Sequence, residues 1–271
     1  MQNNPYVFGH AQPEIERLRR QAEMLRPITQ RLLISAGLEK GMRVLDIGCG
    51  PGDVTMLAAD LVGSTGRVVG IDRDESVIDA ARKRSSELGF SNVEFAQRDV
   101  ETYDGPGGFD VAVCRYVLIH QSDPVRFLQV TRGLVRSGGV IALHEMDITR
   151  GVHSSPRVPL LHQMEALALA AFKQAGIAGD AGGRLVQLFA DAGLPAPHLF
   201  AETIVERGED AVLLAWFTDT LRQVLPRLVA TGVTTEDEIE IDTLTERLQR
   251  AAVELRSQLE LVPQMCGWTR I

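Results

Sequence analysis

A short glycine-rich stretch between residues 44 and 52 is where this sequence could do chemistry. It reads VLDIGCGPG, so an apolar run passes through Asp46 into glycines at alternate positions, Gly48, Gly50 and Gly52. Glycine permits positive φ and lets a ligand approach the backbone closely. The dinucleotide fingerprint places its glycines at the first, third and sixth positions, whereas here the third glycine falls at the fifth position. The anionic Asp46 suits a ligand that carries an ammonium or sulfonium group better than a pyrophosphate.

The elements that must position this turn are strands that alternate with helices. We expect strands over 43–47, 67–71, 92–96, 109–114 and 140–143, and helices over 53–61, 75–88 and 124–135. This alternation predicts a parallel sheet with crossover helices. Asp72 ends the second strand about 20 residues after the turn, the distance at which a carboxylate accepts hydrogen bonds from ribose hydroxyls. Asp99 follows the third strand in the same way.

Taken together, Asp46, the three glycines, Asp72, Asp99 and the strand that contains Phe109 and Asp110 resemble the class I S-adenosylmethionine-dependent methyltransferases. Within them, the sequence is most similar to the small-molecule branch with the ubiquinone/menaquinone-type enzymes. The motifs span roughly residues 43–147. The resemblance implies an α/β fold, with a Rossmann-like, mostly parallel sheet of seven strands, helices on both faces and helical lid or insertion elements.

The resemblance also implies which residues bind S-adenosylmethionine. The methionine part would lie over the turn and beside the end of the fourth strand, at Asp46, Gly48, Cys49, Gly50, Gly52, Arg115 and Tyr116. The ribose and adenine would lie at Asp72, Arg73, Asp99 and Val100. Each acid could instead have a purely structural role. Asp46 could stabilise the turn, Asp72 could cap a helix before Ser76, and Asp99 could be a loop acid. Arg73 could equally be a solvated neighbour of Asp72.

Methyl transfer asks the enzyme mainly to align the acceptor with the methyl carbon and to exclude water. Where the acceptor must lose a proton, histidine is the favoured base near neutral pH. The best candidate is His120, in the loop after the fourth strand, which would also contact substrate; its alternative is a packing residue that caps the next helix. His144 and Glu145, at the end of the fifth strand, are the next candidates for catalysis or substrate contact.

The flanking segments are expected to form the acceptor pocket. We predict a helical lid over 1–40, a cofactor-binding core over 41–150, and a remainder over 151–271 with insertions at about 151–195 and 209–261. Within this remainder we expect helices over 160–175, 182–192, 209–230 and 236–261, and strands over 198–206 and 265–271. In the lid, Tyr6, Phe8 and Gln21 could touch the substrate, or the segment could simply cap the sheet.

Composition sets outer bounds on the function. The 271 residues are 45% hydrophobic and 24% charged, as in a globular protein, and the net charge of −8 argues against a broad nucleic-acid interface. The three cysteines lack metal-binding spacing, and the pattern of a magnesium-dependent catechol enzyme is absent around Glu145 and Asp147, so we expect no metal. Without an apolar leader or membrane-length run, a cytoplasmic protein is expected, and a homodimer is compatible with the sequence.

The function that this sequence predicts is methyl transfer from S-adenosylmethionine to a small, partly apolar metabolite, as in secondary metabolism. One alternative is an enzyme of the same fold that binds the cofactor but catalyses a non-methylating reaction, such as a cyclisation or isomerisation. Another is a non-catalytic protein that only binds S-adenosylmethionine. The missing sixth-position glycine disfavours a nicotinamide oxidoreductase.

Overall fold

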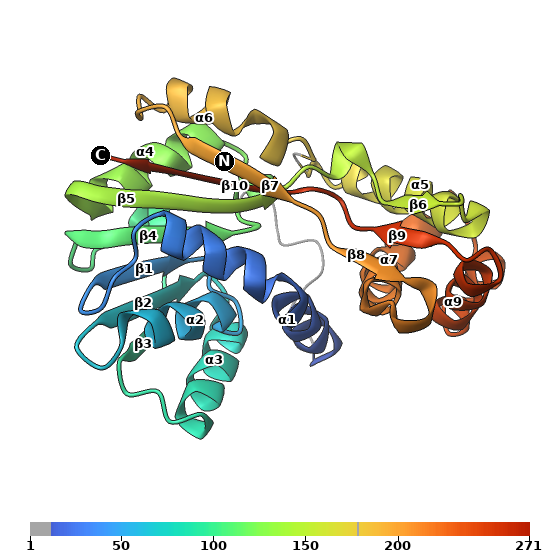
Figure 1. Cartoon of the computed structure of the whole chain (residues 1–271), viewed down its shortest axis with the longest axis horizontal. Coiled ribbons are helices and arrows are strands. Elements are labelled where there is room, and N and C mark those ends of the chain that lie inside the picture. Colours follow the sequence, from blue (N-terminus) through green and yellow to red (C-terminus); the bar gives the residue numbers. More distant parts are fainter. Residues whose placement is uncertain (1–11, 178) are drawn as a thin grey trace.

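A twisted sheet of seven strands forms the centre of the molecule (Figure 1). The computed structural model describes residues 12–177 and 179–271. The strand order is β3-β2-β1-β4-β5-β10-β7, and β10 is the antiparallel strand between β5 and β7. The strands are β1 (Arg43–Ile47), β2 (Arg67–Asp72), β3 (Val93–Gln97), β4 (Phe109–Arg115), β5 (Val135–Met146), β7 (His198–Glu202) and β10 (Gln264–Arg270). The predicted fold class is therefore confirmed.

Helices cover both faces of this sheet. The crossovers β1-α2-β2 and β4-α4-β5 run in opposite directions along the sheet, so their right-handedness places α2 and α4 on opposite faces. The helices of these two layers are α1 (Gln12–Ser35), α2 (Asp53–Val62), α3 (Glu75–Glu87), α4 (Pro124–Leu134) and α6 (Leu185–Asp191). Because both faces are covered, the central strands are apolar almost throughout, and Val111 to Cys114 of β4 are all buried.

The remaining elements gather beyond the ends of the central strands, at the right in Figure 1. They are α5 (Pro159–Gln174), α7 (Val212–Ala230), α8 (Glu236–Ile239), α9 (Leu244–Glu254) and a three-stranded antiparallel sheet of β6 (His153–Ser155), β9 (Gln258–Glu260) and β8 (Val205–Arg207). Short 3₁₀ turns are η1 (Val100–Thr102), η2 (Leu118–His120), η3 (Ile148–Arg150), η4 (Gly182–Arg184) and η5 (Gly208–Asp210). Helix α7 packs against both α1 and α5, which joins these elements to α1.

Two sequence predictions in this region were wrong. The strand expected over 198–206 is broken into β7 and β8, which belong to different sheets. The helix expected over 236–261 is divided into α8, α9 and β9, because α8 ends at Glu240 in the left-handed conformation (φ 47°). Residues 258–260 are extended because they pair with β6 and β8 on either side. Within the described residues, no helix has the length and apolar character needed to cross a membrane.

Candidate active site

A cavity of about 560 Å³ opens at the carboxyl edge of the parallel strands and continues between α1, α5 and α7. One end is lined by the turn after β1 and by the ends of β2 and β3, including Gly48, Cys49, Gly50, Asp72, Arg73, Arg98, Asp99 and Val100. The middle is lined by Arg115, Tyr116, Val117, Ile119, His120 and Gln121 from β4 and the loop that follows it. The other end is mainly apolar, with Met146, Ile148, Val152, Ala168, Leu169, Phe172, Ile177, Trp216, Phe217 and Val262.

The glycine turn has the geometry that the sequence predicts. Gly48, Gly50 and Gly52 all have positive φ, at 67°, 52° and 84°. A Cβ atom added to Gly48 would lie 2.6 Å from Val117 Cγ2, and one added to Gly52 would lie 2.8 Å from Phe95 Cζ. At Gly50, which lines the cavity, an added Cβ would meet no protein atom within 4 Å. The turn therefore leaves space for a ligand beside Gly50, as the methionine part of the cofactor requires.

We therefore expect different consequences at two of these glycines. Replacing Gly50 with valine should weaken binding of S-adenosylhomocysteine at least tenfold, because the side chain would occupy ligand space. The free energy of unfolding of Gly50→Val should fall by only about 1–2 kcal/mol, because valine is strained in the left-handed backbone conformation. Gly52→Val should mainly lower the melting temperature, because its side chain collides with Phe95. Calorimetric titration and thermal unfolding of both variants separate the two effects; equal affinity of Gly50→Val and the parent protein would contradict the assignment.

Asp72 is held by backbone amides at the rim of the cavity. Its Oδ2 accepts from Gly50 N at 3.0 Å, and its Oδ1 accepts from Asp74 N at 3.1 Å. The cap of α3 is Asp74, whose Oδ1 accepts from Ser76 N at 2.7 Å. Asp72 thus links the second strand to the glycine turn. The alternative, that Asp72 caps the following helix, is not supported, because Asp74 caps α3. The carboxylate lines the cavity, and its contact with the ribose hydroxyls of the cofactor remains a prediction.

The adenine end was predicted at Asp99, Val100 and Arg73, and all three line the cavity. Asp99 also caps η1, because its Oδ1 accepts from Glu101 N at 2.9 Å. Val100 is buried, whereas Arg73 is exposed at the rim. Their contacts with adenine remain predictions.

Asp46 is placed differently from the other predicted cofactor residues. Its side chain is buried beneath the turn, where Oδ2 accepts from Thr55 Oγ1 at 2.6 Å, and it is not part of the cavity lining. Burial raises its pKa to about 7, against the opposing effects of Thr55 and Arg115. This placement favours the turn-stabilising interpretation over direct contact with the cofactor. Cys49 does line the cavity, but burial raises the pKa of its thiol, so it stays protonated.

Arg115 and Tyr116 line the middle of the cavity, as predicted for the methionine end. Arg115 Nη1 donates to Thr29 Oγ1 at 3.3 Å, which ties the end of β4 to α1. Tyr116 has a φ of 58°, an uncommon conformation for a bulky residue, and its hydroxyl donates to Gln264 Oε1. This backbone conformation turns the chain out of the sheet and into the loop that carries His120.

His144 and Glu145 are fully buried behind this loop and are not part of the cavity lining. His144 lies between Thr29 Oγ1, at 2.9 Å from Nδ1, and Gln264 Oε1, at 3.2 Å from Nε2. Glu145 Oε1 accepts from the amides of Val117 and Leu118, at 2.9 and 2.8 Å. Their placement does not support the predicted catalytic role or substrate contact. Glu145 holds the start of the loop, and the His144 ring packs edge-on against Tyr116.

Glu145 gives a prediction for stability against pH. Burial raises its pKa to about 8, from about 4.5, so the folded state favours the protonated acid and stability falls as pH rises through this window. Between pH 6.5 and 8 this should cost about 2 kcal/mol, at about 1.4 kcal/mol per unit. Glu145→Gln stays neutral, so its stability relative to the parent should increase by that amount across the same interval. Urea unfolding of both proteins at pH 6.5 and 8 tests this. If the difference between their free energies of unfolding is the same at both pH values, the prediction is contradicted.

His120 is the one predicted catalytic residue that lines the cavity. It is the last residue of η2, and its backbone N donates to Val117 O at 3.0 Å. Burial, with the positive charges of Arg17 and Arg73 nearby, lowers its pKa to about 4. At neutral pH the imidazole is therefore uncharged and only weakly basic.

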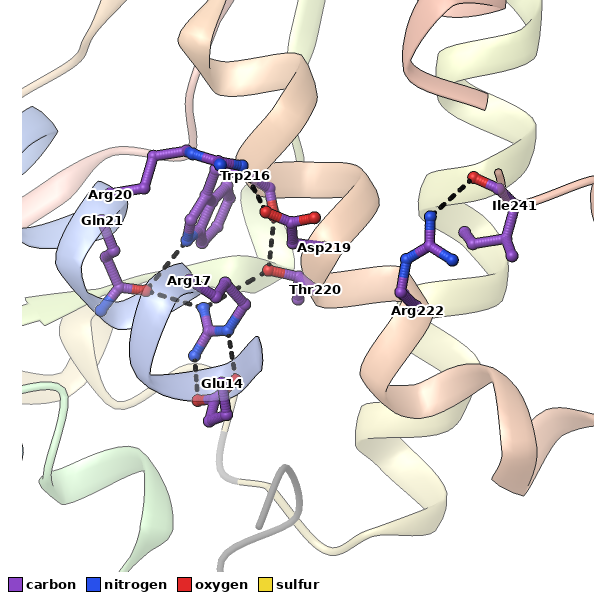
Figure 2. A network of polar contacts seen from close by, with 9 residues as sticks. All are labelled: Glu14, Arg17, Arg20, Gln21, Trp216, Asp219, Thr220, Arg222 and Ile241. Atoms are coloured by element: carbon purple, nitrogen blue, oxygen red, sulfur yellow. Dashed lines mark hydrogen bonds and ion pairs between the residues drawn. The ribbon is translucent and has the colours of Figure 1, made fainter. Parts of the chain in front are cut away.

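A polar network between α1 and α7 includes Arg17, Gln21, Trp216 and Thr220, which line the cavity (Figure 2). Arg17 makes a bidentate ion pair with Glu14, at 2.6 and 2.7 Å, and its Nη1 donates to Gln21 Oε1 at 3.0 Å. Gln21 Oε1 also accepts from Trp216 Nε1 at 3.0 Å, and Thr220 Oγ1 lies 3.5 Å from Arg17 Nη1. The network thus joins α1 to α7.

Of the predicted substrate residues in the lid, Gln21 lines the cavity, and its ligand contact remains a prediction. Tyr6 and Phe8 lie outside the described residues. The sequence analysis missed Arg17 and Trp216, which line the cavity beside Gln21. Glu14, Arg17 and Gln21 are spaced at three and four residues, a spacing that places them on one helix face and could have indicated this cluster.

A second hydrogen-bonded chain lies near the apolar end. Ser154 Oγ is 3.1 Å from His162 Nε2, and His162 Nδ1 is 3.2 Å from Glu165 Oε2. The order of groups is that of a hydrolase triad, but Ser154 is buried outside the cavity and its Oγ accepts from Val158 N at 2.8 Å. The chain therefore fixes the start of α5 and orients Glu165 at the cavity wall. Among the described residues, no cluster of His, Cys, Asp and Glu could hold a metal ion.

Comparison with known proteins agrees with this geometry. A family model described as a methyltransferase domain matches residues 38–192, more than half of the chain. The chain therefore belongs to the methyltransferase-domain family, and its glycine turn, acids and sheet are those of the class I S-adenosylmethionine-dependent enzymes. Gly50 and Asp72 fit this cofactor, because Gly50 leaves open space and Asp72 places an acceptor carboxylate on the cavity wall.

Two curated relatives illustrate the sequence similarity. Aklanonic acid methyltransferase DauC from Streptomyces sp. (strain C5) is 38% identical over 121 residues, which cover 44% of this chain and 55% of the relative. Demethylmenaquinone methyltransferase from Staphylococcus aureus (strain MRSA252) is 30% identical over 139 residues, which cover 51% of this chain and 54% of the relative. The chain thus spans about half the length of these relatives.

Solved structures show the same fold at low sequence identity. The YcgJ protein from Bacillus subtilis matches with a TM-score of 0.52 and 17% identity, over 90% of this chain and 98% of that chain. The [4+2]-cyclase SpnF matches with the same TM-score and identity, over 90% of this chain and 80% of that chain. At this identity the similarity concerns the fold alone.

Proposed function

We propose that this chain transfers the methyl group of S-adenosylmethionine to a small, largely apolar organic acceptor. The observation that carries this proposal is the continuity of the cavity. It runs from the glycine turn and Asp72, past the loop that carries His120, into a mainly apolar chamber under α1, α5 and α7. The cofactor, when bound, supplies a methyl group on a positively charged sulfur, and the chamber supplies a dry site in which an acceptor can be aligned with it.

The composition of the chamber supports the acceptor class. Side chains from α5 and α7, such as Leu169, Phe172 and Phe217, give it apolar walls, and polar groups are few. Binding sites of this kind favour organic ligands that bury most of their surface, with a small number of polar groups to orient them. The relatives' names support the same class, because aklanonic acid and demethylmenaquinone are both organic metabolites.

The test follows the methyl group. The purified protein is incubated with S-adenosylmethionine labelled on its methyl carbon and a fractionated metabolite extract, and the label is followed by mass spectrometry. We expect label in a new compound, with S-adenosylhomocysteine formed in step, and transfer at least fivefold slower by Asp72→Ala at the same low cofactor concentration. Cofactor binding without transfer from any fraction would overturn the proposal. A new unlabelled product in that case would indicate the cyclase or isomerase alternative.

A further inference from the structure

The acceptor end of the cavity contains a buried cation. Arg17 is only 3% exposed, yet it lines the cavity, and its ion-pair partner Glu14 does not. Glu14 is fully buried behind it and binds the guanidinium through both carboxylate oxygens. The pair is thus oriented with its positive member on the cavity wall. Buried ion pairs often contribute little net stability, so this arrangement calls for an explanation in terms of the ligand.

The orientation of the Arg17 guanidinium is also fixed by hydrogen bonds. Gln21 and Thr220 accept from Nη1, and Gln21 is in turn fixed by the indole N–H of Trp216 (Figure 2). Two helices that are distant in sequence therefore fix one arginine toward the cavity. Arginine is suited to such a site, because its charge persists at all working pH values.

Arg17 and His120 line the same cavity, and the charge of Arg17 is one of the causes that lower the pKa of this imidazole to about 4. Further charged groups on the cavity wall are Arg115, in the same part as His120, Arg73, at the rim, and Glu165. Glu165 is held by His162 and by the amide of Val152. A neutral hydroxyl with a pKa near 10 could transfer its proton to such a histidine only against an equilibrium of about a millionfold. An acceptor that arrives ionised needs no base.

We propose that the acceptor is an organic anion whose charged oxygen lies against Arg17 beside His120, and that this oxygen takes the methyl group. The inference rests on the proposed function. A lone pair on the oxyanion forms the bond to the methyl carbon, while the carbon–sulfur bond breaks and its electrons stay on sulfur. The acceptor loses its negative charge, the sulfonium loses its positive charge, and no proton moves. The remainder of the acceptor occupies the apolar chamber.

The loss of charge provides a test that does not require the acceptor's identity. The metabolite extract is separated on an anion exchanger at pH 7.5, and each fraction is assayed with methyl-labelled S-adenosylmethionine. We expect the acceptor in the retained fraction and its labelled product with one negative charge fewer, so that it elutes earlier. Label obtained only from the unretained, neutral fraction would overturn this inference and leave the proposed function intact. Label from no fraction would overturn the proposed function, and this inference with it.

A variant then tests the part played by Arg17. Because Arg17→Gln alone leaves the Glu14 carboxylate buried without its main partner, the double variant Glu14→Gln/Arg17→Gln is measured beside it. We expect the double variant to bind S-adenosylhomocysteine like the parent and to show at least a tenfold higher KM for the retained acceptor fraction. The control is Arg26→Gln on the same helix, whose exposed ion pair with Asp60 (3.1 Å) lies away from this cavity. An unchanged KM in a folded double variant would contradict the proposal.

Discussion

Replacing Asp72 with alanine should weaken the binding of S-adenosylmethionine by about 1–3 kcal/mol, or roughly 5- to 150-fold, because hydrogen bonds to a charged acceptor are lost. The carboxylate lies on the cavity wall and is already fixed by the amides of Gly50 and Asp74, so little ordering is needed when ribose hydroxyls bind. The same contacts mean that the substitution also releases the glycine turn. Both effects reduce affinity, so the loss should be among the largest that one substitution causes at this site.

Calorimetric titration with S-adenosylhomocysteine measures this effect without turnover. The matched control is Asp123→Ala, which removes a carboxylate that caps α4 through Arg126 N (2.8 Å) but does not line the cavity. It should lower the melting temperature, since loss of such a cap costs about 1 kcal/mol, and leave the affinity unchanged. Equal affinities for Asp72→Ala and the parent protein would sink the ribose assignment.

Replacing Trp216 with alanine should have the largest effect on stability, a loss of about 3 kcal/mol or more in the free energy of unfolding. The indole is 7% exposed and packs where α7 meets the lid helix, so its removal leaves a void beside Gln21 and Arg17. Urea unfolding measures the loss.

The control for this prediction is Trp216→Phe, which keeps most of the packing and removes the hydrogen bond to Gln21. It should cost only about 1 kcal/mol. If alanine and phenylalanine cost the same, the indole contributes through its N–H alone, and the packing explanation fails.

The cofactor half of the site could be predicted from the sequence because its signals are local. A strand that ends in an acid, a turn of spaced glycines and a second acid about 20 residues later all lie within one βαβ unit. The structure places Gly48, Gly50 and Asp72 together on the cavity wall. Position in the sequence, however, did not show that Asp46 differs from Asp72. The Asp46 side chain is buried below the glycine turn, where it binds Thr55. The sequence shows that an acid follows the strand, but not to which side of the backbone it points.

The acceptor half depends on contacts that are distant in the sequence. Arg17 and Thr220 are about 200 residues apart, and neither helix alone indicates that they meet. His144 and Glu145 are at the end of a strand, as predicted, but β5 is central and covered on both faces, so both side chains are buried whichever way they point. The three-residue strands β6, β8 and β9 depend on pairing between distant segments, since β9 lies between β6 and β8, and no local pattern reveals such pairing.

The antiparallel strand β10 has a consequence for how the chain folds. β7 joins the large sheet only through β10, which itself pairs with β5 more than a hundred residues earlier in the chain. During synthesis, β1 to β5 can pair as they emerge, but β7 has no partner in this sheet until residues 264–270 have been made. Since distant pairings form slowly, this edge should be the last part of the sheet to close. Gln264 lies on that strand and accepts a hydrogen bond from the hydroxyl of Tyr116, so the loop that carries His120 gains this support only in the final step of folding.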